Sequence, residues 1–115
     1  MDERLEKALT FSNYRITIEN KRIALKRRFA TMLVVHNNNG MFNADAATIS
    51  FVAVLIDAGH TDSVLIDQKN TPIEVADLVT FKAELIDAYY KATNEYASEM
   101  KKLSNARNVK KAMDW

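Results

Sequence analysis

The sequence predicts a mainly α-helical protein of the α+β class, with two long antiparallel amphipathic helices, a short buried middle helix and two β-hairpins. Three observations lead to this prediction. The glycines and the proline, Gly40, Gly59 and Pro72, all lie in the middle third, so strong backbone breakers are confined there. Apolar residues recur every three or four positions in both outer thirds, as on one face of a helix. Between them, short segments of strand-forming residues flank turn-type residues.

The N-terminal third is predicted to be one helix. Its apolar stripe consists of Leu5, Ala8, Phe11, Tyr14, Ile18, Leu25 and Phe29. Arg22 stands where this spacing calls for an apolar residue. The alternation of Tyr14, Ile16 and Ile18 is also typical of a strand, and we favour a helix because the flanking stretches contain no breaker.

The first hairpin and the middle helix follow. Strand-forming residues 32–35 lead into a turn in which Asn39-Gly40 suits positive φ at both central positions. A helix over residues 44–58 can be capped by Asn43 or Asp45 and ended by Gly59 in a left-handed conformation. Its residues 49–56 leave little polar face, so we expect it to be the most buried element.

The second hairpin and a long C-terminal helix complete the chain. Residues 63–66 and 72–75 flank a polar turn, and Pro72 suits the start of an edge strand because it has no N–H to donate. The apolar stripe of the last helix is Leu78, Phe81, Leu85, Tyr89, Ala92, Tyr96, Met100, Leu103, Ala106, Val109 and Met113. Its eleven-residue repeat predicts a straight helix.

Composition fits one folded domain over residues 1–115. Hydrophobic residues make up 48% and charged residues 27%, as in ordinary globular proteins. The net charge of +1 predicts no global attraction to nucleic acid or to an anionic membrane. The absence of cysteine excludes disulfides, thiolate nucleophiles and the common structural zinc sites. The longest apolar run, residues 49–56, is far shorter than the roughly 20 residues of a bilayer span, and the charged opening residues argue against a signal peptide.

Basic residues gather in two clusters. The first basic cluster is Lys21, Arg22, Lys26, Arg27 and Arg28, and the second basic cluster is Lys101, Lys102, Arg107, Lys110 and Lys111. If the long helices pack antiparallel with Tyr14 near Tyr96 and Leu25 near Leu85, each cluster faces carboxylates. The carboxylates are Glu74, Asp77, Glu84 and Asp87 for the first cluster, and Asp2, Glu3 and Glu6 for the second. We therefore expect both clusters to be paired within the chain. In the alternative interpretation the first cluster binds nucleic-acid phosphate.

Residue patterns of known chemistry are missing from the sequence. It contains no nucleophile elbow, glycine-rich phosphate loop, HExxH zinc motif or EF-hand loop, so we expect no enzyme activity, no catalytic residue and no cofactor. His60 lies near Asp57, Asp62 and Asp67, a set that could in principle hold a divalent cation. Their spacing matches no metal motif, and we interpret them as helix-ending and turn residues, with His36 as another turn residue. Tyr90 is the surface tyrosine best placed to stack on a base.

Several short stretches carry a resemblance to a known group of proteins. They are Leu5-Glu6-Lys7-Ala8-Leu9 with Phe11-Ser12-Asn13-Tyr14, Asn39-Gly40 leading to Phe42, Leu65-Ile66-Asp67 with Pro72-Ile73, Ala92-Thr93-Asn94-Glu95-Tyr96, and the closing Asp114-Trp115. Together they resemble small uncharacterised proteins of contractile-tailed phages of marine bacteria, over nearly the whole chain. The resemblance implies a viral source, a virion or assembly role, and phage structural proteins as partners. It transfers no functional residue.

The leading functional hypothesis is a non-enzymatic structural or assembly protein of phage type that acts through protein–protein contacts as a homo-oligomer. Such a protein would lie in the host cytoplasm or in the virion, without a membrane or small-molecule partner. The expected intersubunit residues are Phe11, Ile16, Ile23, Met113 and Trp115. The alternative is a nucleic-acid-binding module that uses the first basic cluster.

Overall fold

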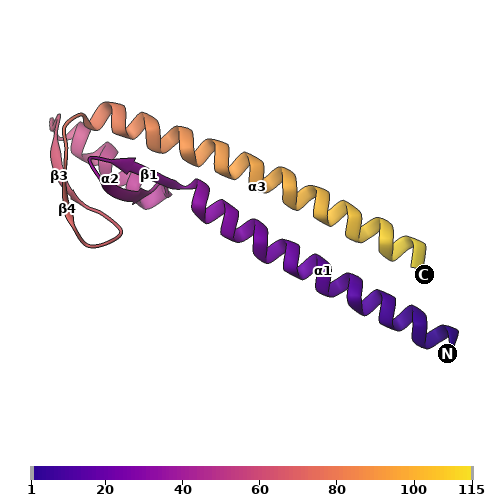
Figure 1. Ribbon diagram of the computed structural model, residues 1–115. Helices are drawn as coiled ribbons and strands as arrows, with labels where there is room; N and C mark the ends of the chain where they lie inside the picture. The colour runs from indigo at the N-terminus through magenta and orange to yellow at the C-terminus, as the bar shows by residue number, and fades with distance from the viewer. Residues whose placement is uncertain (1, 115) are drawn as a thin grey trace. The chain divides into compact units, whose positions relative to one another are not determined.

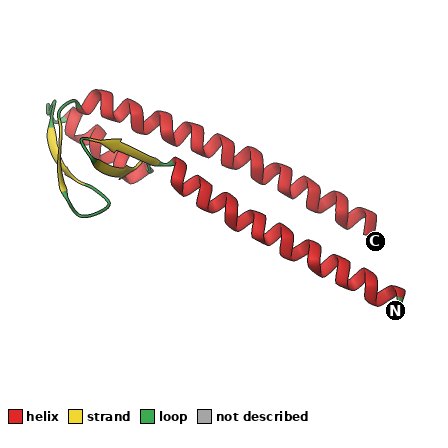
Figure 2. Ribbon diagram, in the orientation of Figure 1, coloured by secondary structure: helices red, strands yellow, loops and turns green. Residues whose placement is uncertain are grey.

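The computed structural model describes the backbone of residues 2–114 and the side chains of residues 2–105. In chain order its elements are α1 (Glu3–Met32), β1 (Val34–Asn37), β2 (Gly40–Asn43), α2 (Ala46–Asp57), β3 (Ser63–Ile66), β4 (Pro72–Val75) and α3 (Leu78–Asp114) (Figures 1 and 2). The prediction of a mainly helical α+β fold with three helices and two hairpins is confirmed.

The chain divides into two compact units. The helical unit comprises Met1–Arg28 and Glu95–Trp115, and the mixed unit comprises Phe29–Asn94. Both boundaries fall inside α1 and α3 rather than in loops. The expectation of one domain over the whole chain stays a prediction, and each unit is described below by itself.

The core of the mixed unit brings α2, the hairpins and the first turns of α3 together. Leu78, Phe81 and Leu85 of α3 are fully buried, at the three- and four-residue spacing of one helix face. Phe81 meets Phe42 of β2 edge to face, with ring centroids 5.0 Å apart. The other buried core residues are Ala44, Val52, Leu65, Ile73 and Val75.

The first hairpin turns one residue earlier than predicted. The residues with positive φ are Asn38 (46°) and Asn39 (66°), and Gly40 already belongs to β2. Gly40 is buried, and a Cβ atom there would lie 2.6 Å from Cγ1 of Ile73. The chain needs glycine at this position for close packing and not for the turn. His36 lies in β1, paired with Met41, so its interpretation as a turn residue is wrong.

The ends of α2 agree with the sequence, whereas its burial does not. Asp45 is the N-cap, and its Oδ1 accepts the N–H of Thr48 at 2.8 Å. Beyond the helix, Gly59 has φ +94° and its N–H donates to the carbonyl of Ile56. The prediction that this helix is the most buried element is wrong, because Val52 is its one buried residue. Only one side of α2 packs on the core, which leaves Phe51 and Val54 55% and 61% exposed.

Asp67 links the second hairpin to the first. β3 and β4 pair antiparallel, with Leu65 opposite Ile73. In the turn between them, the buried carboxylate of Asp67 accepts the N–H groups of Lys69 and Thr71 at 2.9 and 3.0 Å. It also accepts the N–H of Met41 in β2 at 3.1 Å. These hydrogen bonds, with that of Thr71 contributing most, lower the pKa of Asp67 below its usual value.

The apolar stripes predicted for the long helices agree with the observed burial in their middle parts and disagree with it at some other positions. On α1, Ile18 is buried and Phe11, Tyr14 and Leu25 are half-buried, but Leu5 is 50% exposed. On α3, Tyr96, Met100 and Leu103 are half-buried. Tyr89 is 41% exposed because Ala88, one position earlier, takes the covered place against the core.

Candidate functional site

The first basic cluster occupies the C-terminal part of α1, and part of it is paired. Nη1 of Arg22 lies 3.8 Å from Oε2 of Glu19, and Nη2 of Arg28 lies 2.5 Å from Oε1 of Glu95. Lys21 and Lys26 are exposed and form no ion pair within residues 2–105. The cluster is therefore neither fully neutralised nor fully bare.

The predicted partners of these clusters differ from the observed ones. Among the carboxylates expected to face the first cluster, Asp77 accepts from Thr80 and Asp87 pairs with Lys91 at 3.0 Å. The reason is that the start of α3 is committed to the core of the mixed unit, so Arg28 meets Glu95, well beyond the position that the predicted register requires. In the second cluster, Lys102 lies 3.2 Å from Glu99 and Lys101 is exposed. Arg107, Lys110 and Lys111 lie outside the described side chains.

The geometry of α1 distributes the first basic cluster around the helix. At about 100° per residue, Lys21 and Arg28 point to one side, Arg22 and Lys26 to another, and Arg27 to a third. A nucleic-acid backbone that lies along one face of α1 can therefore meet only part of the cluster. This arrangement weakens the alternative interpretation.

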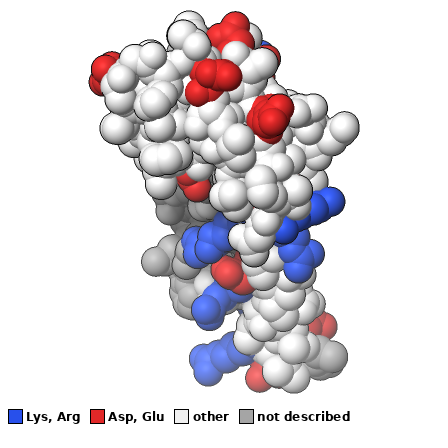
Figure 3. All heavy atoms as spheres, turned by 90° about the vertical axis from the view of Figure 1, so that its left-hand side faces the viewer, with Lys and Arg blue, Asp and Glu red and all other residues white. Residues whose placement is uncertain are grey.

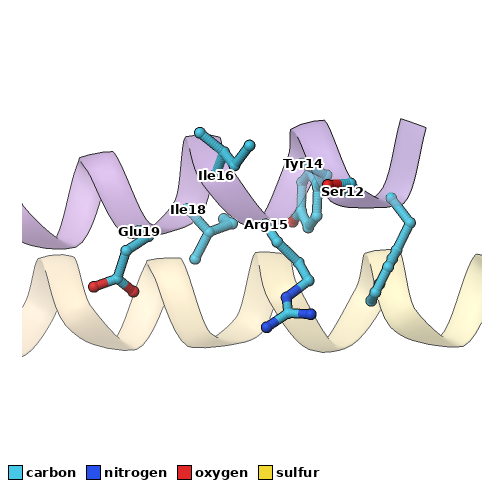
Figure 4. Close-up of a pocket in the computed structure, with 7 residues that line it drawn as sticks. Ser12, Tyr14, Arg15, Ile16, Ile18 and Glu19 are labelled. Carbon is cyan, nitrogen blue, oxygen red and sulfur yellow. The ribbon is translucent and has the colours of Figure 1, made fainter. Parts of the chain in front are cut away.

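A row of exposed apolar side chains follows the side of α1 opposite its covered stripe. This outer face consists of Leu5, Leu9, Ile16 and Ile23, which are 50%, 48%, 57% and 42% exposed. Leu9, Ile16 and Ile23 are seven residues apart, so they stack on one side of the helix. Figure 4 shows Ile16 pointing away from the neighbouring helix, whereas Ile18 points toward it.

Two of the five expected intersubunit residues lie on this outer face. They are Ile16 and Ile23. The sequence predicted Leu5 on the covered stripe and assigned Leu9 to no face, so both residues were missed. Phe11 belongs to the covered side, where it is half-buried. Met113 and Trp115 lie outside the described side chains.

A hollow of about 680 Å³ lies beside α1, and its lining includes both Ile18 of the covered side and Ile16 of the outer face (Figure 4). Among the described side chains, those that line it run from Phe11 to Glu19 and come from α1. A small-molecule site needs polar groups that converge from several directions. The hollow shows no such convergence within the described residues, and we assign it no ligand.

The mixed unit carries an apolar cleft between α2 and β3. It has a volume of about 480 Å³, and its rim includes Phe51, Val64 and Ile66, which are 55%, 56% and 60% exposed. Asp45 and Asp67 are the charged residues among its lining, which contains neither Lys nor Arg. The sequence analysis missed this cleft because it treated α2 as covered on all sides.

Charge is distributed unequally between the two units, although the whole chain is nearly neutral. The mixed unit holds 3 basic and 8 acidic residues, a net charge of −5. The helical unit holds 13 basic and 7 acidic residues, a net charge of +6. On the face drawn in Figure 3, carboxylates and cations gather mostly in separate areas. The helical unit therefore has a positive electrostatic potential around it, and the mixed unit a negative one. The net charge of the whole chain does not reveal this separation.

The acidic residues around His60 do not form a metal site. Within the described residues no group of three His, Asp or Glu side chains is close enough to hold a metal ion. Asp67 serves the hairpin turn, and the His60 N–H donates to the carbonyl of Leu55 at the end of α2. The interpretation of Asp67 and His60 as turn and helix-ending residues is confirmed.

In the described part of the chain no helix combines the length and the apolar character needed to cross a membrane. No protein-family model, curated protein or solved structure matches the chain.

Proposed function

We propose that this protein is a non-enzymatic assembly protein that acts through protein–protein contacts and associates with copies of itself. The observation that carries the proposal is the outer face of α1. Four large apolar side chains in a row are about half exposed there, and burying the exposed half of each one would contribute roughly 1 kcal/mol. Contiguous exposed apolar surface of this kind is typical of interaction sites.

The proposal includes the prediction that the two long helices are amphipathic and pack antiparallel to each other. The ion pair between Arg28 and Glu95 supports this arrangement, because it joins the C-terminal part of α1 to the beginning of the α3 segment in the helical unit. The phage-type role rests on the sequence resemblance alone. A genomic neighbourhood of capsid or tail genes would support it, and a metabolic operon would argue against it.

Light scattering over a wide concentration range tests the assembly proposal. We expect the weight-average mass of the wild-type protein to rise above 13.1 kDa with concentration. The Ile16→Glu/Ile23→Glu variant should stay monomeric, because two carboxylates replace the centre of the outer face. Thr10→Glu is the matched control, since it adds a carboxylate at an exposed position of α1 away from that face. A wild-type protein that stays monomeric throughout would refute the proposal.

Nucleic-acid binding is the second candidate function, and the net charge of +6 on the helical unit favours it. Fluorescence anisotropy with labelled DNA and RNA at low salt tests it. If it is correct, binding weakens steeply with added salt and is lost in the Arg27→Ala/Arg28→Ala variant. Absence of binding at low salt would remove this candidate.

A further inference from the structure

We infer that the apolar cleft of one copy receives the outer face of α1 from a second copy. This inference rests on the proposed self-association and goes further by naming the two surfaces that meet. The cleft lies between α2 and β3 in the mixed unit, and the outer face belongs to the helical unit. The two surfaces are different, and in the inferred assembly each pair of copies shares one such contact, which makes the contact heterologous.

The cleft has the character of a site for an amphipathic helix. Its exposed rim residues Phe51, Val64 and Ile66 come from a helix on one side and a strand on the other. Val52 and Leu65, which are buried, form part of its floor. An amphipathic helix typically lays its apolar face into a hydrophobic groove of this kind and anchors it through side chains at helical spacing.

The outer face of α1 offers a matching row of anchors. Ile16 and Ile23 are two turns apart, which corresponds to about 10 Å along the helix axis. Both are exposed in the monomer, and they lie within a single unbroken helix. A preformed helix loses little conformational entropy on docking, which favours association.

Charge complementarity selects this pairing over the symmetric ones. Residues 15–28 of α1 hold six basic side chains and one acidic side chain, a net charge of +5. These cations are spread around the helix and Arg28 pairs with Glu95, so part of this charge lies beside Ile16 and Ile23. The cleft contains two aspartates and no cation, on a unit of net charge −5. Pairing two clefts would bring together two acidic units, and pairing two outer faces through Ile16 and Ile23 would bring together two basic segments. Like charges across an interface oppose association, whereas opposite charges favour it and speed the encounter.

A heterologous contact leaves each assembled pair with one free cleft and one free outer face. Further copies can therefore add until a ring closes or a filament grows. A symmetric contact would stop at the dimer. The two surfaces also permit a mixing experiment, because a copy that lacks one of them keeps the other.

Two variants separate the surfaces. The helix variant Ile16→Glu/Ile23→Glu keeps a native cleft, and the cleft variant Phe51→Gln/Ile66→Thr keeps a native α1. All four positions are at least 42% exposed, so the fold should tolerate the changes, and circular dichroism checks this. Tyr90→Gln is the matched control for the cleft variant, because Tyr90 is a 67% exposed aromatic residue of the mixed unit that does not line the cleft.

Light scattering is then measured for each variant alone and for their equimolar mixture. We expect each variant alone to stay at 13.1 kDa, Tyr90→Gln to assemble like the wild type, and the mixture to reach twice the monomer mass and no more. A mixture that stays monomeric overturns the inference, because each variant still carries the surface that the other one lacks. A cleft variant that assembles like the wild type also overturns it, and leaves self-association through α1 intact. A wild-type protein that never associates refutes the proposed function itself.

Discussion

Asp67 shows how one carboxylate can organise the mixed unit. Its two oxygens accept N–H groups from its own turn and from β2, so that the two hairpins share one acceptor. A neutral acid would accept these hydrogen bonds less well than the carboxylate. The ionised form is therefore the one that the folded state favours, in agreement with the lowered pKa.

This lowered pKa predicts a dependence of stability on pH. The folded-state pKa of Asp67 lies below the unfolded value of about 3.8, so its stabilising contribution is present above that pH and is lost as the pH falls through the folded value. We expect the melting temperature to fall on acidification below about pH 4. We also expect Asp67→Asn to melt at a lower temperature at pH 7 and to lose less on acidification. Asp62→Asn, an exposed control, should melt like the wild type, and an Asp67→Asn curve identical to the wild type would contradict the account.

Gly40 gives a second prediction at the residue scale, because a side chain at this position would conflict with Ile73. Gly40→Ala should destabilise the protein by about 1–3 kcal/mol, because its Cβ would lie 2.6 Å from Cγ1 of Ile73. Truncating the neighbour in Gly40→Ala/Ile73→Ala should relieve part of this cost, as measured by a double-mutant cycle of urea unfolding. Gly59→Ala is the contrast: nothing lies within 4 Å of its Cβ, and its cost comes from φ +94° alone. Additive effects of the Gly40 and Ile73 changes would count against the packing explanation.

The hairpins and α2 show at the element scale how far sequence reasoning reaches. The bounds of the helices were predictable because breakers and caps act locally: Asp45 begins α2 and Gly59 ends it. The turn of the first hairpin was not, since asparagine can also adopt positive φ and Gly40 is needed in β2 for close packing against Ile73. Whether an apolar residue such as Phe51 is covered depends on a partner element, and local spacing does not contain that information.

The outer face of α1 and the apolar cleft were likewise only partly predictable from local spacing. The exposure of Ile16 and Ile23 was predictable, because they stand outside the main apolar stripe of α1. The cleft was not predictable, because its walls come from segments about 15 residues apart that meet only in the folded unit. The predicted register of α1 against α3 was wrong for a related reason. Leu78, Phe81 and Leu85 pack in the core of the mixed unit.

The cap of α2 gives a prediction at this scale. Asp45→Ala should cost about 1 kcal/mol, because it removes the acceptor for the Thr48 N–H. Asp57→Ala is the matched control at the other end of the same helix. It should cost nothing, because a negative charge near a helix C-terminus is unfavourable. Urea unfolding of both variants measures the difference, and equal losses would show that the cap is not responsible.

At the scale of the whole molecule, the separation of charge matters more than the net value of +1. The mixed unit has a net charge of −5 and the helical unit a net charge of +6, and in the proposed assembly these opposite charges favour contact between unlike units of two copies. The sequence contains this information, but it becomes visible only when the structure divides the chain into units. The strength of that attraction depends on the ionic strength of the solution.

Salt therefore distinguishes the proposed assembly from a purely apolar one. Raising sodium chloride from about 0.05 to 0.5 M shortens the screening length severalfold and should lower the average mass at a fixed protein concentration. Apolar association alone would be unchanged or strengthened by salts that are excluded from the protein surface. A mass that rises with salt would argue against charge complementarity.

The absence of cysteine allows a direct measurement of whether the outer face of α1 becomes covered. Ser12→Cys places a single thiol on this side of the helix, between Leu9 and Ile16, where a polarity-sensitive fluorophore can be attached without removing an apolar residue. With increasing concentration of unlabelled protein, the emission should shift to the blue at position 12 and stay constant in the matched variant Thr10→Cys. Emission that stays constant at position 12 while light scattering shows assembly would contradict the claim that copies meet through this face.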